Sequence, residues 1–140
     1  KIWKADGSFV QTLEGHKDDV QTAAFSPDGT RIITASHDHT VKVWGAAGKV
    51  IETLGDHSTY AFSAAFSPQG YKIATASADK SVLIYNTADL KMIRKIKTLG
   101  LSDKVVPWIS EACFLFQVFS FATSKKYEWN AHSLEPVRVA

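Results

Sequence analysis

Short apolar runs separated by polar turn residues dominate the first hundred residues of the chain. Residues 20–26 and 31–36 are two such runs, and the turn Ser26-Pro27-Asp28-Gly29 separates them. Proline presets φ in a turn of this kind, and glycine tolerates the conformation that closes it. The next run, residues 40–44, alternates apolar and polar positions, as a strand with one buried face does. Runs this short, rich in β-branched residues, favour strands over helices.

The same pattern returns after 41 residues. Of the 33 offset pairs from Thr12/Thr53 to Trp44/Tyr85, 15 are identical and no gap is needed. Trp3 also lies 41 residues before Trp44, so the unit extends toward the amino terminus. Repeats of this length are typical of stacked supersecondary units, each of which needs its neighbours to bury its apolar face.

Each repeat is expected to supply four short antiparallel strands. We place the repeats at approximately residues 5–45, 46–86 and 87–130, with a tail at 131–140 that completes the last unit of a single segment spanning 1–140. The expected strands are 20–26, 31–36, 40–44 and 49–54 in the first unit, 60–67, 72–77, 81–85 and 91–97 in the second, and 105–111, 114–122, 126–129 and 137–139 in the third.

This pattern predicts an all-β fold, a partial β-propeller of about three four-stranded antiparallel blades plus one extra strand at Phe9–Leu13. Propellers close with about 4–8 blades. We therefore expect the chain to be an arc of a larger ring, completed by a longer chain, by further copies or by another subunit.

Composition excludes several classes of protein. The 140 residues are 45% hydrophobic, enough for a core, but no apolar stretch is long enough to span a membrane. The chain begins Lys1-Ile2-Trp3, without a signal-peptide pattern. Cys113 is the only cysteine, which excludes an intrachain disulfide and predicts an intracellular location, cytoplasm or nucleus. A net charge of +2 does not by itself indicate a nucleic-acid partner.

Three motifs resemble those of the WD-repeat β-propeller family. They are Gly15-His16, the turn Phe25-Ser26-Pro27-Asp28-Gly29, and the segment Ala35–Trp44 with its serine, aspartate and tryptophan. The resemblance is strong over residues 12–45, good over 53–87 and faint over 100–130. It implies a buried hydrogen-bonded tetrad in each of the first two repeats, formed by His16, Ser36, Asp38 and Trp44 and by His57, Ser77, Asp79 and Tyr85.

Hydrogen-bond chemistry supports a tetrad of these residue types. An indole N–H can donate to a hydroxyl, the hydroxyl to an imidazole, and the imidazole N–H to a carboxylate. The third repeat departs from the pattern, because Leu101, Phe121 and Thr123 stand where the histidine, serine and aspartate are expected. We expect that repeat to rely on aromatic packing.

The resemblance also implies where a partner binds. In the family, contacts gather on the loops before each innermost strand and at the residue preceding the tetrad aspartate. Carried over by position, this rim consists of Lys17, Asp19 and His37, then Ser58, Tyr60 and Ala78, and finally Lys104. Tyr60 is the expected energetic anchor, since aromatic residues are enriched among binding hot spots.

Two catalytic or metal-binding hypotheses are weaker. His16, Ser36 and Asp38 have the composition of a hydrolase triad, but the set recurs one period later and no Gly-x-Ser-x-Gly elbow accompanies it. The alternate histidines of His37-Asp38-His39 could clamp a metal ion, yet a third and a fourth ligand are not evident. The sequence therefore predicts no catalytic residue, no cofactor and no metal.

The leading functional hypothesis is a non-catalytic scaffold or adaptor that binds other proteins or peptides within a multi-subunit complex, without a small-molecule substrate. One alternative is a substrate-recognition or regulatory module of a larger chain that carries a catalytic domain. Another is a ribonucleoprotein component that contacts RNA through the basic residues of the strand at 91–97, namely Lys91, Arg94, Lys95 and Lys97. Protection of a sheet edge explains these charges equally well, with Met92, Ile93 and Ile96 packed inward.

Overall fold

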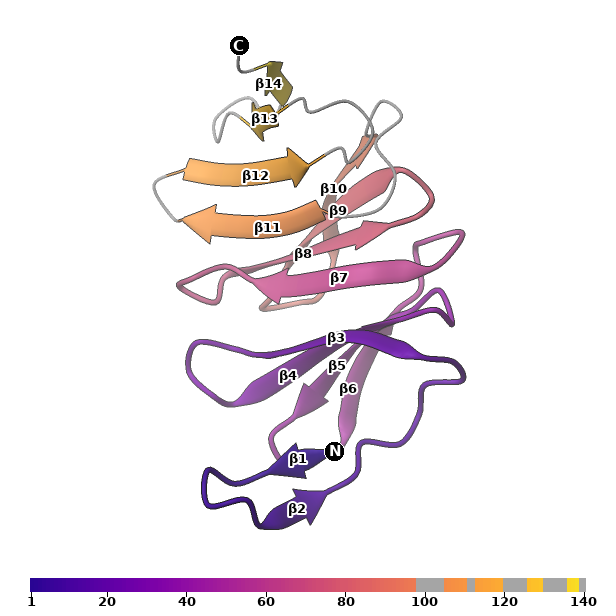
Figure 1. Cartoon of the computed structure of the whole chain (residues 1–140), viewed down its shortest axis with the longest axis vertical. Coiled ribbons are helices and arrows are strands. Elements are labelled where there is room, and N and C mark those ends of the chain that lie inside the picture. Colours follow the sequence, from indigo (N-terminus) through magenta and orange to yellow (C-terminus); the bar gives the residue numbers. More distant parts are fainter. Residues whose placement is uncertain (98–104, 111–112, 120–125, 130–135, 139–140) are drawn as a thin grey trace.

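The fold is built from β-strands alone in the described part of the chain. The computed structural model describes residues 1–97, 105–110, 113–119, 126–129 and 136–138, with side chains for residues 1–97. The strands (Figure 1) are β1 (Ile2–Trp3), β2 (Phe9–Gln11), β3 (Val20–Phe25), β4 (Arg31–Ser36), β5 (Val41–Gly45), β6 (Val50–Leu54), β7 (Ala61–Phe66), β8 (Lys72–Ser77), β9 (Ser81–Asn86), β10 (Met92–Lys97), β11 (Val105–Ser110), β12 (Cys113–Phe119), β13 (Lys126–Trp129) and β14 (Pro136–Arg138).

Twelve of these strands form three four-stranded antiparallel sheets, ordered β3-β4-β5-β6, β7-β8-β9-β10 and β11-β12-β13-β14. Neighbours in each sheet are also neighbours in sequence, so every sheet is a simple meander. In the first two units the strand ends agree with the sequence prediction to within one residue. In the third unit the described strands overlap the predicted ones, while the predicted residues 111, 120–122 and 139 lie outside the described residues. The turn residues explain this agreement: at the predicted Pro-Asp-Gly turn, Gly29 has φ of 69° and its amide donates to the Ser26 carbonyl at 2.8 Å.

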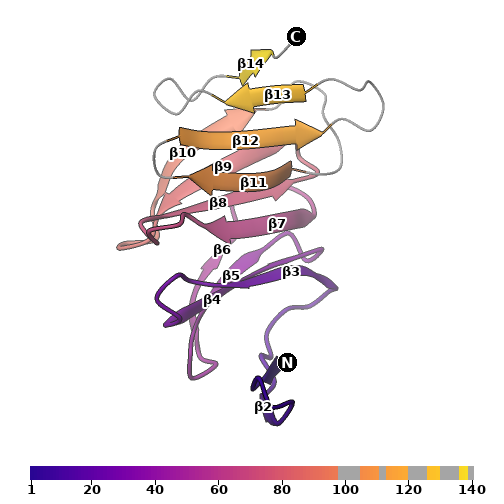
Figure 2. The ribbon, with the colours of Figure 1, turned by 60° about the vertical axis from the view of Figure 1, so that its left-hand side comes forward.

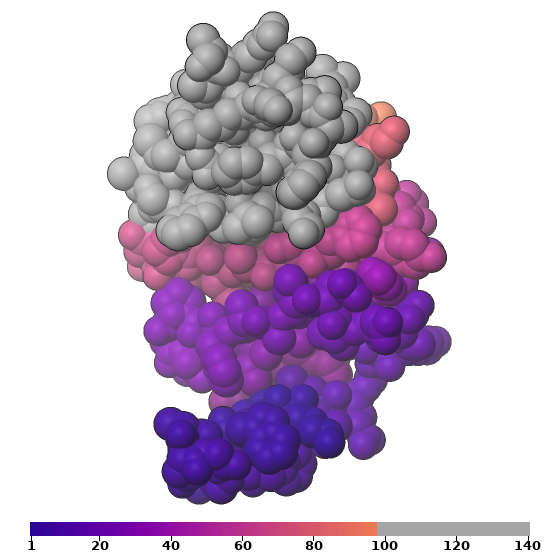
Figure 3. Space-filling view, viewed as in Figure 1, coloured from indigo at the N-terminus to yellow at the C-terminus, as the bar shows by residue number. Residues whose placement is uncertain are grey.

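The amino-terminal segment differs from the prediction of one extra strand. Phe9–Gln11 pairs antiparallel with Ile2–Trp3, so the segment is a two-stranded sheet. The rings of Trp3 and Phe9 pack edge to face at 5.2 Å across it. At the 41-residue offset, β1 and β2 correspond to β5 and β6. Figure 3 shows this hairpin as a lobe beside the first full sheet, and a cavity of about 300 Å³ lies between the two.

The three full sheets stack with their first strands side by side. β3 contacts β7, and β7 contacts β11, and both ribbon views show these strands along one edge of the stack (Figures 1 and 2). The first and second sheets bury one continuous apolar core between them, formed chiefly by Ile33, Ala35, Val41, Val43 and Leu54 on one side and Ala61, Ala64, Phe66, Ile73, Leu83 and Tyr85 on the other.

The stack presents two opposite faces of turns. We call one the histidine face, which consists of segments 15–19 and 37–40 of the first repeat and 55–60 and 78–80 of the second. Backbone bonds tie these segments together, as in His37 N–H to Asp19 O at 2.9 Å and Ala78 N–H to Tyr60 O at 3.0 Å. The other, which we call the proline face, carries the turns at 26–30 and 67–71.

Candidate functional site

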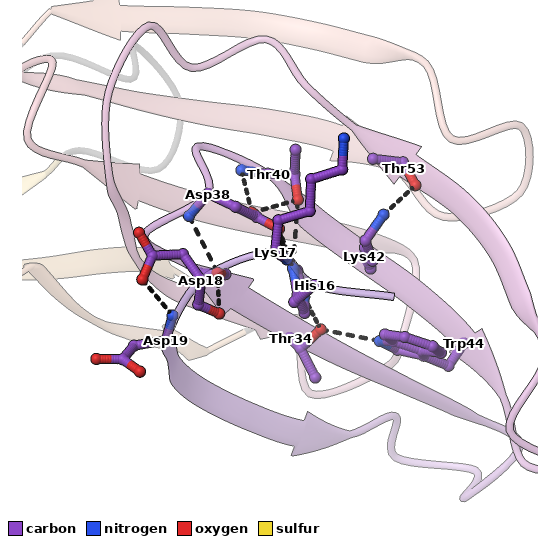
Figure 4. Close-up of polar contacts among 11 residues, drawn as sticks. His16, Lys17, Asp18, Asp19, Thr34, Asp38, Thr40, Lys42, Trp44 and Thr53 are labelled. Carbon is purple, nitrogen blue, oxygen red and sulfur yellow. Dashed lines mark hydrogen bonds and ion pairs between the residues drawn. The ribbon is translucent and has the colours of Figure 1, made fainter. Parts of the chain in front are cut away.

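A buried histidine–aspartate pair anchors the histidine face in the first repeat. His16 Nδ1 lies 2.8 Å from Asp38 Oδ2, and the two side chains are only 6% and 8% exposed (Figure 4). The carboxylate also accepts the Lys17 amide at 3.0 Å and the Thr40 hydroxyl at 2.6 Å. Burial alone would raise the pKa of Asp38, but these hydrogen bonds outweigh it and hold the pKa well below its usual value.

The second repeat contains the same pair. His57 Nδ1 lies 3.0 Å from Asp79 Oδ2, and the side chains are 1% and 5% exposed. Burial opposes the charge on Asp79, but hydrogen bonds from Ser81, His57 and the Ser58 amide lower its pKa to about 2. Burial also dominates at the imidazole and lowers the pKa of His57, against the opposing effect of Asp79.

The hydroxyl between the imidazole and the indole belongs to Thr34, whereas the sequence analysis assigned it to Ser36. Trp44 Nε1 donates to Thr34 Oγ1 at 2.8 Å, and the same oxygen lies 2.7 Å from His16 Nε2. Ser36 instead donates to the Asp18 carbonyl at 3.0 Å and accepts the Asp38 amide at 3.1 Å.

Strand register explains the difference. Trp44 on β5 lies opposite Ile32 on β4. Thr34 is two residues further along β4 and on the same face, within reach of the indole. Ser36 is four residues along, about 13 Å at the usual strand rise. The same correction applies to the second repeat, where Thr75 Oγ1 lies 2.8 Å from His57 Nε2.

The aromatic member of the second network also has a different partner. Tyr85 donates its hydroxyl to Asp56 Oδ2 at 2.8 Å. A phenol presents its polar atom at the far end of the ring, so it reaches past the threonine. Asp56 corresponds to Gly15 in the first repeat, and there a Cβ would lie 3.3 Å from the indole of Trp44. Glycine therefore accompanies the larger tryptophan, and aspartate the tyrosine.

The two histidine networks connect loops of the histidine face to one another. Each joins the segment before a first strand to the turn two strands later, so the loops of the histidine face are held in place. The triad hypothesis lacks its essential contact, because the hydrogen bonds of the Ser36 hydroxyl go to backbone atoms of Asp18 and Asp38 and none joins it to His16. That geometry does not activate a serine nucleophile.

The residues proposed for the partner-binding rim lie on the histidine face. The exposed ones are Lys17, Asp19, Ser58 and Tyr60, while His37 and Ala78 are half-buried. Lys104, the counterpart in the third unit, lies outside the described residues. Six of the seven positions therefore lie on this face, three in each of the first two repeats, and a ring contact joins His37 of the first repeat to Tyr60 of the second.

A cluster of four rings spans that junction and was missed in the sequence analysis. Tyr60 lies with its ring centroid 4.7 Å from that of His37 and 5.6 Å from that of His39. Phe62 completes the cluster, 5.8 Å from His37 and 6.5 Å from Tyr60. Tyr60 remains 45% exposed. The only available signal was the pair of aromatic residues Tyr60 and Phe62, two positions apart in the predicted strand 60–67, and this pair does not reveal the histidines of the neighbouring sheet.

Both histidine rings of the proposed metal clamp pack against the ring of Tyr60. Asp38 is occupied by His16 and backbone amides, and His39 adopts a left-handed φ of 71°. His37 lies instead beside two carboxylates of the segment before β3. One carboxylate oxygen of Asp18, one of Asp19 and a ring nitrogen of His37 all lie within 4.8 Å of one another.

The basic strand lies at one edge of the second sheet. Lys91, Arg94, Lys95 and Lys97 are exposed on or next to β10. Ile96 is buried as predicted, but Met92 and Ile93 are 46% and 55% exposed. The prediction that all three apolar residues pack inward is therefore wrong for Met92 and Ile93. The pairing of β10 with β9 shifts register between Met92 and Arg94, so the regular alternation of the strand is interrupted at these residues.

Comparison with known proteins identifies the family. The family model WD40, described as "WD domain, G-beta repeat", matches residues 7–45 and 48–86, more than half of the chain. The chain therefore belongs to the WD40 repeat family. No curated protein matches the chain.

Solved structures confirm the fold. The chain is similar to the WD40 repeats of RRP9, with a TM-score of 0.76 and 19% identity over 91% of this chain and 40% of that one. It is similar to a chain of a Mitotic Checkpoint Complex, with a TM-score of 0.79 and 21% identity over 94% and 41% of the two chains. It thus spans about two fifths of either neighbour. The predicted all-β partial propeller is confirmed, and the three four-stranded sheets are its blades. Within the described residues, no helix is long and apolar enough to cross a membrane.

Proposed function

We propose that the chain is a non-catalytic scaffold or adaptor and that it binds other proteins or peptides through its histidine face. The four-ring cluster of His37, His39, Tyr60 and Phe62 carries this proposal. Its central ring is nearly half exposed and stands on a rigid base, because the two histidine networks hold the surrounding loops. Exposed aromatic residues on a preorganised surface are typical anchors of protein interfaces.

The surroundings of the rings support the same function. The cluster joins two blades, so a bound segment would contact both repeats at once. One of the similar structures belongs to a multi-subunit complex, which is the kind of setting that we propose for this chain. An intracellular location, cytoplasm or nucleus, accompanies the proposal because of the single cysteine, Cys113.

A pair of matched tyrosine variants tests the proposal. Tyr60→Ala removes the exposed ring of the histidine face, and Tyr71→Ala removes a ring that is 74% exposed on the proline face. Proteins captured by the wild-type chain from a cell extract are quantified against both variants by mass spectrometry. We expect at least one specific partner to be lost with Tyr60→Ala and retained with Tyr71→Ala. Equal recovery with all three proteins would refute the assignment of this face.

A further inference from the structure

The carboxylates of Asp18 and Asp19 lie next to the ring cluster and point to the chemistry of the partner. Both residues are exposed and precede β3 directly. His37 links them to the rings, since its nitrogen lies within 4.8 Å of both carboxylates and its ring centroid lies 4.7 Å from that of Tyr60. Two negative charges and an exposed phenol ring therefore share one small surface.

Neither carboxylate has an internal cation in the described part of the chain. Asp18 accepts the amide of Asp19 at 2.8 Å, and no ion pair joins either residue to a lysine or arginine there. Figure 4 shows the amine of the neighbouring Lys17 directed away from both carboxylates. The contrast with Asp38 and Asp79 is clear, because those carboxylates are buried and fully engaged by hydrogen bonds.

Arginine fits this combination better than other side chains do. Its guanidinium is planar, donates to carboxylates through a fork of N–H groups, and stacks on aromatic faces. A cation is attracted to a ring when it lies within about 6 Å of the ring centroid. Lysine would satisfy the charge but not the stacking geometry, and an apolar side chain would leave both carboxylates without a partner.

We propose that Asp18, Asp19 and the Tyr60 ring form a subsite for one arginine side chain of the bound protein or peptide. The His37 ring lies beside both the two carboxylates and the Tyr60 ring in this subsite. The inference rests on the proposed function and specifies it: the partner segment presents an arginine to the junction of the first two blades. Because both carboxylates are exposed, the attraction weakens with added salt.

Defined peptides test the subsite without knowledge of the partner. Acetylated and amidated pentapeptides Gly-Ser-X-Ser-Gly, with X as arginine, lysine or citrulline, are titrated into the isotope-labelled full chain and followed by NMR. The arginine peptide is expected to bind in the millimolar range and to shift the amides of Asp18, Asp19, His37 and Tyr60. Citrulline keeps the shape and loses the charge, so its peptide is expected to bind at least about fivefold more weakly.

Matched variants assign the interaction to the named groups. Asp18→Asn and Asp19→Asn both keep the side-chain shape, and Asp18→Asn also keeps the oxygen that accepts the Asp19 amide. Each is expected to weaken binding of the arginine peptide about fivefold. Asp89→Asn is the control, because this exposed carboxylate also accepts a nearby amide but lies away from the histidine face. Tyr60→Phe is expected to retain binding and Tyr60→Ala to lose it.

Three outcomes would overturn the inference. The first is equal affinity for the arginine and citrulline peptides, and the second is chemical-shift changes located away from the four named amides. The third is Zn²⁺ binding that depends on His37 together with an affinity for the arginine peptide that neither Asp18→Asn nor Asp19→Asn changes. If the peptides fail but partner capture still depends on Tyr60, the arginine subsite is wrong and the scaffold function stands. If capture does not depend on Tyr60, the proposed function itself fails.

Discussion

Replacing Thr34 by valine tests whether this threonine, and not Ser36, completes the first histidine network. Valine keeps the β-branched shape and removes the hydroxyl. Two buried groups then lose a partner: the indole N–H of Trp44 and the Nε2 atom of His16. Thr34 is 4% exposed and Trp44 is 1% exposed, so water has little access to the groups that lose their hydrogen bond.

The equivalent change in the second repeat removes fewer interactions. Thr75→Val leaves the Nε2 atom of His57 without its partner, but the hydroxyl of Tyr85 is bound elsewhere. An orphaned buried group costs about 1–3 kcal/mol. We therefore expect Thr34→Val to lower the free energy of unfolding by about 3 kcal/mol and Thr75→Val by about half as much.

Urea denaturation of the full chain, followed by tryptophan fluorescence and circular dichroism, measures both values. With an m value of about 2 kcal/mol per molar urea, the midpoints of the two variants should differ by roughly 0.7 M. Thr53→Val is the control, because this exposed threonine accepts only the Lys42 amine, and its effect should stay below about 0.5 kcal/mol.

Equal losses for Thr34→Val and Thr75→Val would refute the reasoning, since only the first hydroxyl serves two buried partners. So would a loss for Thr34→Val no larger than that of the Thr53→Val control. Unchanged m values are required, because a change in m would mean that the variant alters the compactness of a state and not only the hydrogen bonds.

Three further changes probe the same framework. The pKa of His57 is lowered by burial and that of Asp79 is lowered to about 2. The free energy of unfolding should therefore fall as the pH drops below 6.5, where the unfolded histidine takes up a proton, and again between about 4 and 2, where the aspartate does. Urea unfolding of His57→Gln as a function of pH should lack the first of these two losses. Gly15→Ala should cost about 1–3 kcal/mol, because φ is +151° and the new Cβ meets Trp44 at 3.3 Å; a thermal melt equal to wild type would contradict this. Tyr85→Phe should cost only about 1 kcal/mol in urea unfolding, because its acceptor is an exposed carboxylate that water can solvate; a loss above about 3 kcal/mol would contradict it.

The hydrophobic pattern was sufficient to predict the strands and their grouping. The turn at Ser26–Gly29 and its counterpart at Ser67–Gly70 are local signals, since proline and glycine act on the backbone through their own geometry. The 41-residue period then indicates that the same structural unit is repeated. Because the apolar runs are short and show no helical period, these units are predicted to be stacked β-sheets. Even the eroded third repeat shows strands close to the predicted ranges.

The choice of Ser36 over Thr34 shows where such reasoning stopped. Both residues are identical in the two repeats and face the same side of β4, so neither alternation nor recurrence separates them. Only the pairing of Trp44 with Ile32 does. That register follows from the length of the turn between β4 and β5. Counting outward from this turn pairs Ala35 with Val41 and then Ile32 with Trp44, so the sequence contained the information needed to choose Thr34.

The sequence by itself determined the local features of this protein: where strands begin and end, how long the unit is, and which histidine accompanies which aspartate at the same spacing in both repeats. Short-range backbone preferences and periodicity carry that information. The tertiary structure alone decided that Tyr60 of the second blade meets His37 of the first, beside the carboxylates of Asp18 and Asp19. Such contacts depend on how one blade is rotated and shifted against the next, which is a property of the packed core and of no single segment.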